Sequence, residues 1–281
     1  MMFKKVTIVG MGLMGGSLGL SLLDKKIAER VTGLGRNLKR LHIAKSKGAA
    51  TDVTTDHKTG ITGAGLVVIS LPVMMIPQAF MDIKPYLSKN TIVTDMGSVK
   101  GAIADKIGLF DTGRNFVGSH PMVGSEKAGI ENMKEGLYDK GACIVTPGAQ
   151  TDKKKAAAVI RLWKTLGMRV STMTPLEHDK CIAGISHFPH LAAFAMVVSH
   201  EKEILENKDI IGPGFKDATR IAASNEALWA EIILMNKAEI LRNVDAYVKQ
   251  LAFLSYMIDK SKISDLKEYI KKSRILRESI K

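Results

Sequence analysis

The stretch VTIVGMGLMGGS, residues 6–17, joins a short β-branched run to a glycine-rich loop and then to an apolar helical segment. Its G-x-G-x-x-G pattern is typical of a turn that binds phosphate. Gly10 permits the tight turn, Gly12 lets the backbone approach a pyrophosphate, and Gly15 allows close packing of the helix. Because the N-terminus of a helix attracts anions, the stretch predicts a dinucleotide-binding site.

Two further pairs of residues are assigned to this nucleotide site. Leu13 and Met14 follow the second glycine, at the start of the expected helix. Ser70 and Leu71 end the apolar run 66–71, which we expect to be a buried strand. We expect all four to contact the cofactor.

The end of the second strand-like run, residues 31–35, bears on the choice of nucleotide. An NAD site usually has an acidic residue about 20 positions beyond the glycines, where it accepts hydrogen bonds from the adenosine ribose. This chain has Gly35 there, followed by Arg36. The absent carboxylate removes repulsion toward a 2′-phosphate, and a guanidinium offers that phosphate a fork of donors. The pair favours NADP over NAD, although an arginine here could instead be solvated and stack on adenine.

The order of strand-like and helical stretches predicts the fold class. Helix-length segments such as 14–25 and 38–47 lie between β-branched runs, which indicates a parallel sheet with helices on its faces. After residue 173 only helical periodicities remain. We therefore predict an α/β Rossmann-type dinucleotide-binding domain over 1–174 and an all-α helical domain over 175–281. The strand-like runs are 6–10, 31–35, 66–71, 91–96, 115–120, 142–147 and 168–173.

Composition points to an ordinary globular protein. The chain has 281 residues, of which 46% are hydrophobic and 25% charged. The apolar stretch 66–80 is interrupted by Pro72 and Pro77 and is shorter than the roughly 20 residues that span a bilayer. The N-terminus lacks the features of a signal peptide, and Cys143 and Cys181 are too few for a disulfide framework. We expect a cytoplasmic protein with no membrane segment.

The net charge of +13 suits an anionic partner. The tail 260–281 is the most one-sided segment, with eight Lys or Arg against three Asp or Glu. Ile263, Leu266 and Ile270 recur there at helical spacing, which predicts an amphipathic helix with a solvated basic face. Since no nucleic-acid motif accompanies the charge, we expect an anionic small molecule as partner rather than nucleic acid.

Four runs in the sequence carry a resemblance to a known family. They are TDMGSVKG (94–101), GSHPMVGSEKAG (118–129), ISHFPHLAA (185–193) and GFKDATRIAAS (214–224). In order and spacing they resemble the motifs of the prephenate and arogenate dehydrogenases of tyrosine biosynthesis, over the core from Gly10 to Trp229. The segment HPM-x-GSEK separates this family from other small reductases that share the glycine loop.

The resemblance implies an oxidative decarboxylation and assigns two catalytic residues. Prephenate would give 4-hydroxyphenylpyruvate, or arogenate would give tyrosine, as a hydride leaves ring carbon C4 for NAD(P) and CO2 departs. His120 matches the partner of the C4 hydroxyl, because a neutral imidazole with a pKa near 6.5 can accept its proton. Ser98 matches the serine that supports this arrangement. The alternatives are a structural histidine at a strand end, and a serine that caps the next helix.

The resemblance also implies how the two ends of the substrate are bound. Arg220 matches the arginine that grips the ring carboxylate, for which bidentate pairing favours arginine. Lys216 and Asp217 precede it and could orient it, while a surface ion pair with Asp217 is the alternative for Arg220. His190 matches the family position that binds the pyruvyl side chain of the substrate. Ser186 and His187 lie beside it in the sequence.

Three remaining residues are assigned to the substrate site on the same grounds. Ser125 and Glu126 belong to the HPM turn, where the resemblance gives Glu126 a gating role, although an exposed loop acid is the alternative. Trp229 resembles an aromatic residue that reaches the site of the neighbouring subunit, while a helical tryptophan is often simply part of the core. The apolar faces of the helical domain predict a homodimer through that domain.

A metal site and two other functions are the alternatives. His178-x-x-Cys181 and His187-x-x-His190 offer four ligands of the kinds that zinc takes, but the spacings match no standard zinc motif, so we expect no metal. A β-hydroxyacid or pyrroline-carboxylate type of NAD(P) reductase would share the glycine loop and the helical second half. A non-catalytic nucleotide sensor is the third function. The sequence leaves open prephenate against arogenate, feedback inhibition by tyrosine, and any role of the basic tail.

Overall fold

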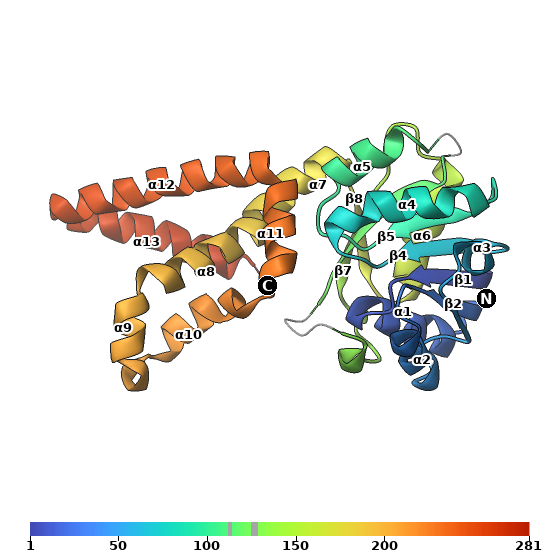
Figure 1. Ribbon diagram of the computed structural model, residues 1–281. Helices are drawn as coiled ribbons and strands as arrows, with labels where there is room; N and C mark the ends of the chain where they lie inside the picture. The colour runs from blue at the N-terminus through green and yellow to red at the C-terminus, as the bar shows by residue number, and fades with distance from the viewer. Residues whose placement is uncertain (112–113, 125–128, 281) are drawn as a thin grey trace. The chain divides into compact units, whose positions relative to one another are not determined.

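The computed structural model describes residues 1–111, 114–124 and 129–280 and divides into two compact units, Met1–Asn236 and Lys237–Lys281 (Figure 1). A twisted sheet is the centre of the first unit, and its strand order over the described residues is β3-β2-β1-β4-β5-β6-β7-β8. Neighbouring strands are parallel except for the pair β6 and β7. The strands are β1 (Phe3–Val9), β2 (Ala28–Leu34), β3 (Asp52–Thr54), β4 (Leu66–Ile69), β5 (Ile92–Asp95), β6 (Phe116–Met122), β7 (Ala142–Thr146) and β8 (Arg169–Thr172).

The Rossmann-type α/β fold is confirmed, and every predicted strand run forms a strand. Strand β3 was not predicted because its three residues are too short to show alternation. The helices of this half are α1 (Leu13–Asp24), α2 (Leu38–Ser46), α3 (His57–Ile61), α4 (Ile76–Ile83), α5 (Gly101–Gly108) and α6 (Lys153–Thr165), with short 3-10 turns at Val73–Met75, Lys84–Tyr86 and Ile130–Asn132.

The sheet buries apolar side chains on both faces, as a parallel sheet must. Alternate residues of one strand enter different cores: Val6 and Ile8 of β1 belong to one cluster and Val9 to the other. The first cluster draws on α1, α2 and α6, and the second on α3, α4 and α5. Figure 1 shows α1 and α2 across the sheet from α4 and α5. The sheet is thus packed on both faces by helices, which fixes the positions of the carboxyl ends of its strands.

Residues 175–236 continue the first unit as helices, which confirms the all-helical character predicted after residue 174. A capping box starts α7, in which Thr174 and Glu177 each bond the other's backbone N–H. A π-helical turn, Ala183–His187, joins α7 to α8. The helices are α7 (Pro175–Ile182), α8 (Phe188–Ser199), α9 (Glu201–Glu206), α10 (Pro213–Thr219) and α11 (Glu226–Met235), with 3-10 turns at Lys208–Ile210 and Arg220–Ala223.

The helical run Pro175–Ser199 is long and apolar enough to cross a membrane by length and composition alone. It nevertheless contains three histidines with hydrogen-bond partners inside the protein, together with a buried aspartate. Buried polar groups with such partners are typical of helices that build a site. We therefore interpret the run as a helical segment of the first unit, with buried polar residues such as His178, Asp179 and His187 and with exposed apolar residues such as Leu176 and Val198.

The second unit is a helical hairpin of α12 (Lys237–Asp259) and α13 (Ile263–Glu278). The hydroxyl of Tyr269 donates to Gln250 Oε1 at 3.0 Å, and the rings of Tyr269 and Phe253 lie 6.3 Å apart. Many of its large apolar side chains are exposed, among them Leu241, Val248, Leu251, Phe253, Ile258, Ile263 and Ile270. The hairpin by itself thus presents unburied apolar surface, together with the basic residues of the tail.

Candidate active site

The glycine loop follows β1 and can be built only with glycine at two of its positions. Gly10 has a φ of +97°, and a Cβ there would lie 2.3 Å from the backbone oxygen of Ser70. A Cβ on Gly15 would lie 2.0 Å from the backbone oxygen of Gly10. A Cβ on Gly12, in contrast, would meet no described atom within 4 Å. The loop is therefore tightly packed at Gly10 and Gly15 and open to a ligand at Gly12, as a pyrophosphate-binding loop requires.

Helix α1 starts directly at this open side. Gly12 is its N-cap, and no side chain of the described residues caps it. The N–H groups of its first turn, from Leu13 and Met14 onward, are thus left for an anion, and the helix dipole favours negative charge at the same place. The residues present fit the pyrophosphate of a nicotinamide dinucleotide.

The end of β2 carries the residues that bear on nucleotide choice. Gly35 continues the strand, donating its N–H to the Thr54 carbonyl at 3.3 Å. Arg36 is exposed, and over the described ranges it forms no ion pair. Asn37 then caps α2 by accepting the N–H of Arg40 at 3.1 Å. No carboxylate occupies the strand end, and a guanidinium follows it.

One cavity of about 320 Å³ joins the nucleotide loop to the predicted catalytic residues. His120 of β6 and Ser98, just after β5, line it. The carboxyl ends of β1, β4 and β5 meet at this edge of the sheet, which is where open α/β sheets bind ligands. The predicted cofactor residues on its wall are Gly12, Leu13, Met14, Ser70 and Leu71.

His120 heads a chain of three hydrogen-bonded side chains. Its Nδ1 lies 2.9 Å from Nε2 of His178, and Nδ1 of His178 lies 2.8 Å from Oδ1 of Asp179. All three residues are buried. His120 comes from β6, whereas the other two come from α7, so the chain links the sheet to the helical half of the first unit.

The hydrogen bonds fix which nitrogen carries each proton. An ionised carboxylate only accepts, so His178 donates from Nδ1 to Asp179. Nε2 of neutral His178 must then accept, and His120 donates to it from Nδ1. The lone pair of neutral His120 is consequently left on Nε2. This is the tautomer that a general base needs.

The surroundings keep both imidazoles neutral near pH 7. Burial lowers the pKa of His120 well below 6.5, and the positive charge of Lys100 lowers it further. Burial also lowers the pKa of His178, while its bond to Asp179 opposes that shift. His120 is therefore ready to accept a proton at neutral pH.

Asp179 also anchors the relay to a second helix. Its Oδ1 accepts the N–H of Lys100 at 2.8 Å, and its Oδ2 accepts the N–H of Gly101 at 2.7 Å. These groups begin α5, whose N-cap has no side-chain bond of its own. The helix dipole favours a carboxylate at the N-terminus of a helix. The relay thus ends on a side chain that its hydrogen bonds hold in place.

Comparison with known proteins decides the family. Residues 18–172 match the model "Prephenate dehydrogenase, nucleotide-binding domain", and residues 174–272 match "Prephenate dehydrogenase, dimerization domain". The chain belongs to the prephenate dehydrogenase family. The prephenate dehydrogenase of Bacillus subtilis is 31% identical, with 98% of this chain and 76% of that protein covered.

Two solved structures of the same family show the likeness in three dimensions. The prephenate dehydrogenase of Aquifex aeolicus, in complex with hydroxyphenyl propionate and NAD+, has 33% identity and a TM-score of 0.92, covering 99% of this chain and 98% of that one. Arogenate dehydrogenase from Synechocystis has 25% identity and a TM-score of 0.87, covering 98% and 99%. A nicotinamide dinucleotide cofactor and a dehydrogenase activity follow for this chain as a family member.

Two of the predicted substrate residues, His190 of α8 and Trp229 of α11, are in contact. His190 stacks on Trp229 with ring centroids 3.6 Å apart and planes inclined by 20°. Its Nδ1 donates to the carbonyl of Ser186 at 2.9 Å, which leaves the lone pair of the neutral ring on Nε2. Trp229 therefore has a contact within its own chain, and it also packs against the second apolar cluster.

His187 lies deeper than its neighbour. It is fully buried, and its Nδ1 accepts from the amide of Asn236 at 3.1 Å. The same amide donates to the carbonyl of Asp179 at 2.9 Å, which ties α11 to the relay helix. Burial lowers the pKa of His187 to about 4, so the ring is neutral. These contacts make His187 a positioning group within the site rather than a surface group.

Arg220 lies on the 3-10 turn that follows α10, with an exposed side chain. Its charge lowers the pKa of His190, after burial, which brings the two predicted substrate residues into one neighbourhood. Lys216 and Asp217 on α10 are also exposed, and the described residues include no ion pair between Asp217 and Arg220. Ser125 and Glu126 lie outside the described residues.

Ser98 lines the cavity without capping a helix. Helix α5 begins at Gly101 with Lys100 as its N-cap, so the alternative role of Ser98 as that cap is wrong. Val99 and Lys100 separate Ser98 from the first helical residue, so Ser98 lies too far from the helix start to be its N-cap. Ser98 is half-buried on the cavity wall with His120.

The four residues considered for zinc do not converge. His178 bonds His120 and Asp179, His187 bonds Asn236, and Cys181 is exposed. Over the part of the chain that the structure describes, no group of three or more His, Cys, Asp or Glu is arranged to hold a metal ion.

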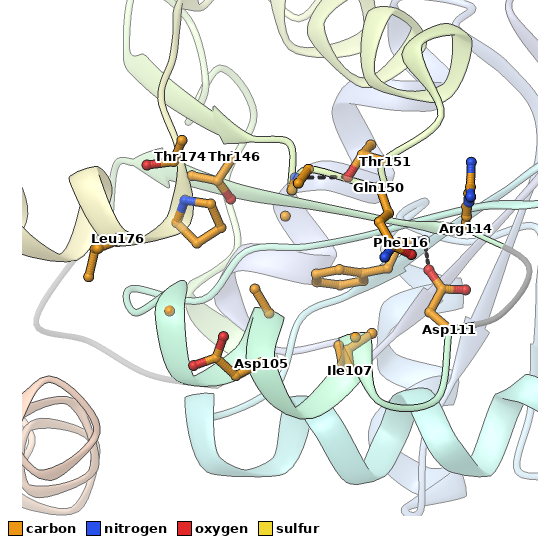
Figure 2. Close-up of a pocket in the computed structure, with 17 residues that line it drawn as sticks. Asp105, Ile107, Asp111, Arg114, Phe116, Thr146, Gln150, Thr151, Thr174 and Leu176 are labelled. Atoms are coloured by element: carbon orange, nitrogen blue, oxygen red, sulfur yellow. Dashed lines mark hydrogen bonds between the residues drawn. The ribbon is translucent and has the colours of Figure 1, made fainter.

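A second cavity, of about 550 Å³, lies apart from all the predicted site residues. Figure 2 shows Thr146 and Thr174 on one side and Asp105 and Ile107 of α5 on the other. Asp111, on the same wall, is occupied by accepting the N–H groups of Asn115 and Phe116. The cavity of His120, although smaller, is the one lined by the predicted catalytic residues.

Three features of the relay escaped the sequence analysis. His178 was considered only as a metal ligand, Asp179 was not considered, and the buried Lys100 was only part of a quoted motif. The usable signal was the pair His178-Asp179 directly after a capping-box pattern, Thr174-x-x-Glu177, which marks the start of a helix. An adjacent donor and acceptor pair in a first turn is poorly placed for metal and well placed for a relay.

Proposed function

We propose that this protein converts prephenate or arogenate to its aromatic product by oxidative decarboxylation, with hydride transfer to NADP or NAD, in tyrosine biosynthesis. The observation that supports it is the position of His120. It lines the same cavity as the glycine loop, and the relay to Asp179 leaves Nε2 of His120 free to accept a proton. Such a base next to a dinucleotide cradle suits the oxidation of an alcohol.

The chain's own residues supply the proton transfer. Nε2 of His120 accepts the proton of the C4 hydroxyl while C4 becomes a carbonyl carbon. The bound nicotinamide supplies the acceptor for the C4 hydride. The bond between the ring and its carboxylate then breaks, CO2 departs, and the electron pair makes the ring aromatic. The resulting phenolate takes the proton back from His120, whose positive charge Asp179 stabilises through His178.

Arg220 is proposed to bind the ring carboxylate. We expect Arg220→Gln to raise KM for prephenate or arogenate by about tenfold or more, because a hydrogen bond to a charged group is worth about 1.5–3 kcal/mol. Steady-state kinetics at saturating nucleotide measure it. Lys202→Gln on α9 removes an exposed positive charge elsewhere and is the control. An unaltered KM in Arg220→Gln would assign this arginine to the solvated surface.

We propose a preference for NADP, supported by Gly35 at the strand end and the exposed Arg36 after it. Arg36→Ala is expected to lower the ratio of kcat/KM with NADP to that with NAD by about tenfold, through loss of a charge-assisted hydrogen bond to the 2′-phosphate. Lys47→Ala at the other end of α2 is the control. A wild-type ratio of one or below, or a ratio that Arg36→Ala leaves unchanged, rejects the preference.

We propose that the helical half, from residue 175 onward, forms a homodimer in a cytoplasmic enzyme. The match of residues 174–272 to a dimerization domain and the exposed apolar side chains of the α12–α13 hairpin support this. The boundary at residue 174 stays a prediction. The compact units divide at residue 236 instead. Asn236 bonds Asp179 of α7, and α7 in turn bonds the start of α5 through Asp179 and strand β6 through His178.

The test of the function is nucleotide reduction. The purified protein is mixed with prephenate or arogenate, each with NADP or NAD, and reduced nucleotide is followed by absorbance. Rapid reduction in one combination identifies both the substrate and the nucleotide. If none of the four is turned over while nucleotide still binds, the reductase or the nucleotide sensor becomes the better explanation.

A further inference from the structure

A buried ion pair lies directly beneath the residue that precedes His120. Lys100 is 1% exposed and Asp95 is completely buried. Nζ of Lys100 contacts Oδ2 of Asp95 and donates to the carbonyl of Ser119 at 2.9 Å. A lysine is almost never buried so fully unless it is paired. Lys100 and Asp95 therefore form a buried ion pair in the core, and the mechanism above gives this pair no role.

The two charges hold the backbone of Ser119 from both sides. Oδ1 of Asp95 accepts the N–H of Ser119 at 3.1 Å, while Lys100 binds its carbonyl. The Ser119 hydroxyl donates to the backbone carbonyl of Asp95 at 2.6 Å. The Ser119 carbonyl belongs to the peptide group that continues into His120. The ion pair thus fixes the backbone from which the catalytic imidazole projects.

The contacts around the pair suit an ammonium and a carboxylate. Asp95 accepts the N–H groups of Gly97, at 2.9 Å, and Ser119 in addition to the contact with Lys100. Two acceptors, Oδ2 of Asp95 and the Ser119 carbonyl, surround Nζ of Lys100. Burial lowers the pKa of Lys100, while the negative charge of Asp95 opposes that shift.

Lys100 also belongs to the relay through its backbone. Its N–H donates to Oδ1 of Asp179, the same oxygen that accepts from His178. Its positive charge lowers the pKa of both His120 and His178. The titratable and charged groups around His120 come from each neighbouring element: His178 and Asp179 of α7, His187 of the π turn, Lys100 before α5, Asp95 of β5 and Cys143 of β7.

We propose that the Lys100–Asp95 pair is a positioning device for His120, which fixes the Ser119 peptide group and keeps the ammonium of Lys100 close to the base, where its charge opposes protonation of the imidazole. The proposal rests on His120 being the base of the proposed reaction. Stability alone does not explain the pair, since an uncharged pair of similar volume often stabilises a core as well or better. A positive charge beside the base has a separate effect, because it disfavours protonation of the imidazole.

The test is the pH dependence of kcat/KM in variants that lack the ammonium. In the wild type we expect kcat/KM to fall on the acid side only below pH 6.5. In Lys100→Met this acid limb should move up by about one pH unit, the size of shift that one nearby charge produces in a protein interior. The double variant Asp95→Asn/Lys100→Met removes both charges of the pair, so it keeps the test available if the single variant does not fold. Its acid limb should also move up.

Lys106→Met is the matched control, since it removes an exposed lysine from the same helix. Its acid limb should coincide with that of the wild type. The proposal is overturned if a folded Lys100 variant keeps the wild-type limb, even if its plateau rate falls, because lost packing alone would lower the plateau. His120→Asn, measured in parallel, separates the two ideas: normal turnover there rejects the proposed base itself, whereas an unmoved limb rejects only the role of Lys100.

Discussion

Replacing His120 with Asn is expected to lower kcat by about 10² or more, the usual scale of general acid–base catalysis. Asn keeps a polar side chain that can still bond His178, but it offers no nitrogen that takes up a proton near neutrality. Nucleotide binding should survive, because the glycine loop is built from β1 and α1. The measurements are kcat with the substrate and nucleotide pair that the wild type uses best, and the Kd of the nucleotide.

Two results would be informative in opposite ways. A large fall in kcat with an unchanged nucleotide Kd supports His120 as the proton acceptor. Unchanged turnover would remove it from the mechanism and leave Ser98, on the same cavity wall, as the next group to examine. A loss of both activity and nucleotide binding would indicate a damaged fold, which the melting temperature reports.

Asp179→Asn is expected to lower kcat by about 10² to 10⁴ with little change in KM. Oδ1 of the carboxylate accepts from Lys100 and His178, and Oδ2 accepts from Gly101, so an amide must turn its NH2 either toward the first two or toward Gly101. If the NH2 faces His178, that ring must accept at Nδ1 and donate from Nε2. His120 then accepts at Nδ1 and carries its proton on Nε2, where no base remains.

The other orientation of the amide has a different signature. If the NH2 faces Gly101, the relay keeps its protons but the start of α5 loses a partner, and stability falls by about 1–3 kcal/mol. Because the start of α5 loses an acceptor in either orientation, kcat distinguishes the two: it falls only if the NH2 faces His178. Cys181→Ser, an exposed change on the same helix, should leave kcat, KM and the melting temperature unchanged. Wild-type kcat together with a wild-type melting temperature in Asp179→Asn would contradict both orientations.

The parts of the fold that follow local rules were predictable from the sequence. The run 6–17 contains its own strand, turn and helix start, and the conformations of Gly10 and Gly15 explain why glycines stand there. Strands buried on both faces are continuous apolar runs, which made β4 visible. Strand β3 has three half-buried residues and gave no such pattern. Short edge strands depend on their neighbours, and a single segment does not reveal them.

The catalytic relay was less predictable because it depends on contacts distant in the sequence. His120 and His178 are 58 positions apart, and only the packing of α7 on the sheet brings them together. The motif resemblance named His120, since its neighbours are distinctive. It did not name Asp179, whose partners are backbone groups at the start of α5. Hydrogen bonds to backbone leave no pairwise pattern in a sequence, so they emerge only from the fold.

The place of Asp179 has a consequence for dividing this enzyme into pieces. The natural cutting point in the sequence, after residue 174, leaves Asp179 on the far side of the cut from the α5 amides and from His120. A fragment that ends at residue 174 would keep the glycine loop, the sheet and the histidine, yet it would lack both the cap of α5 and the partner that sets the proton on His120. A chimaera made from two relatives therefore has to keep the first turns of α7 with the nucleotide-binding half. Otherwise Asp179, which determines where His120 carries its proton, would come from the other parent.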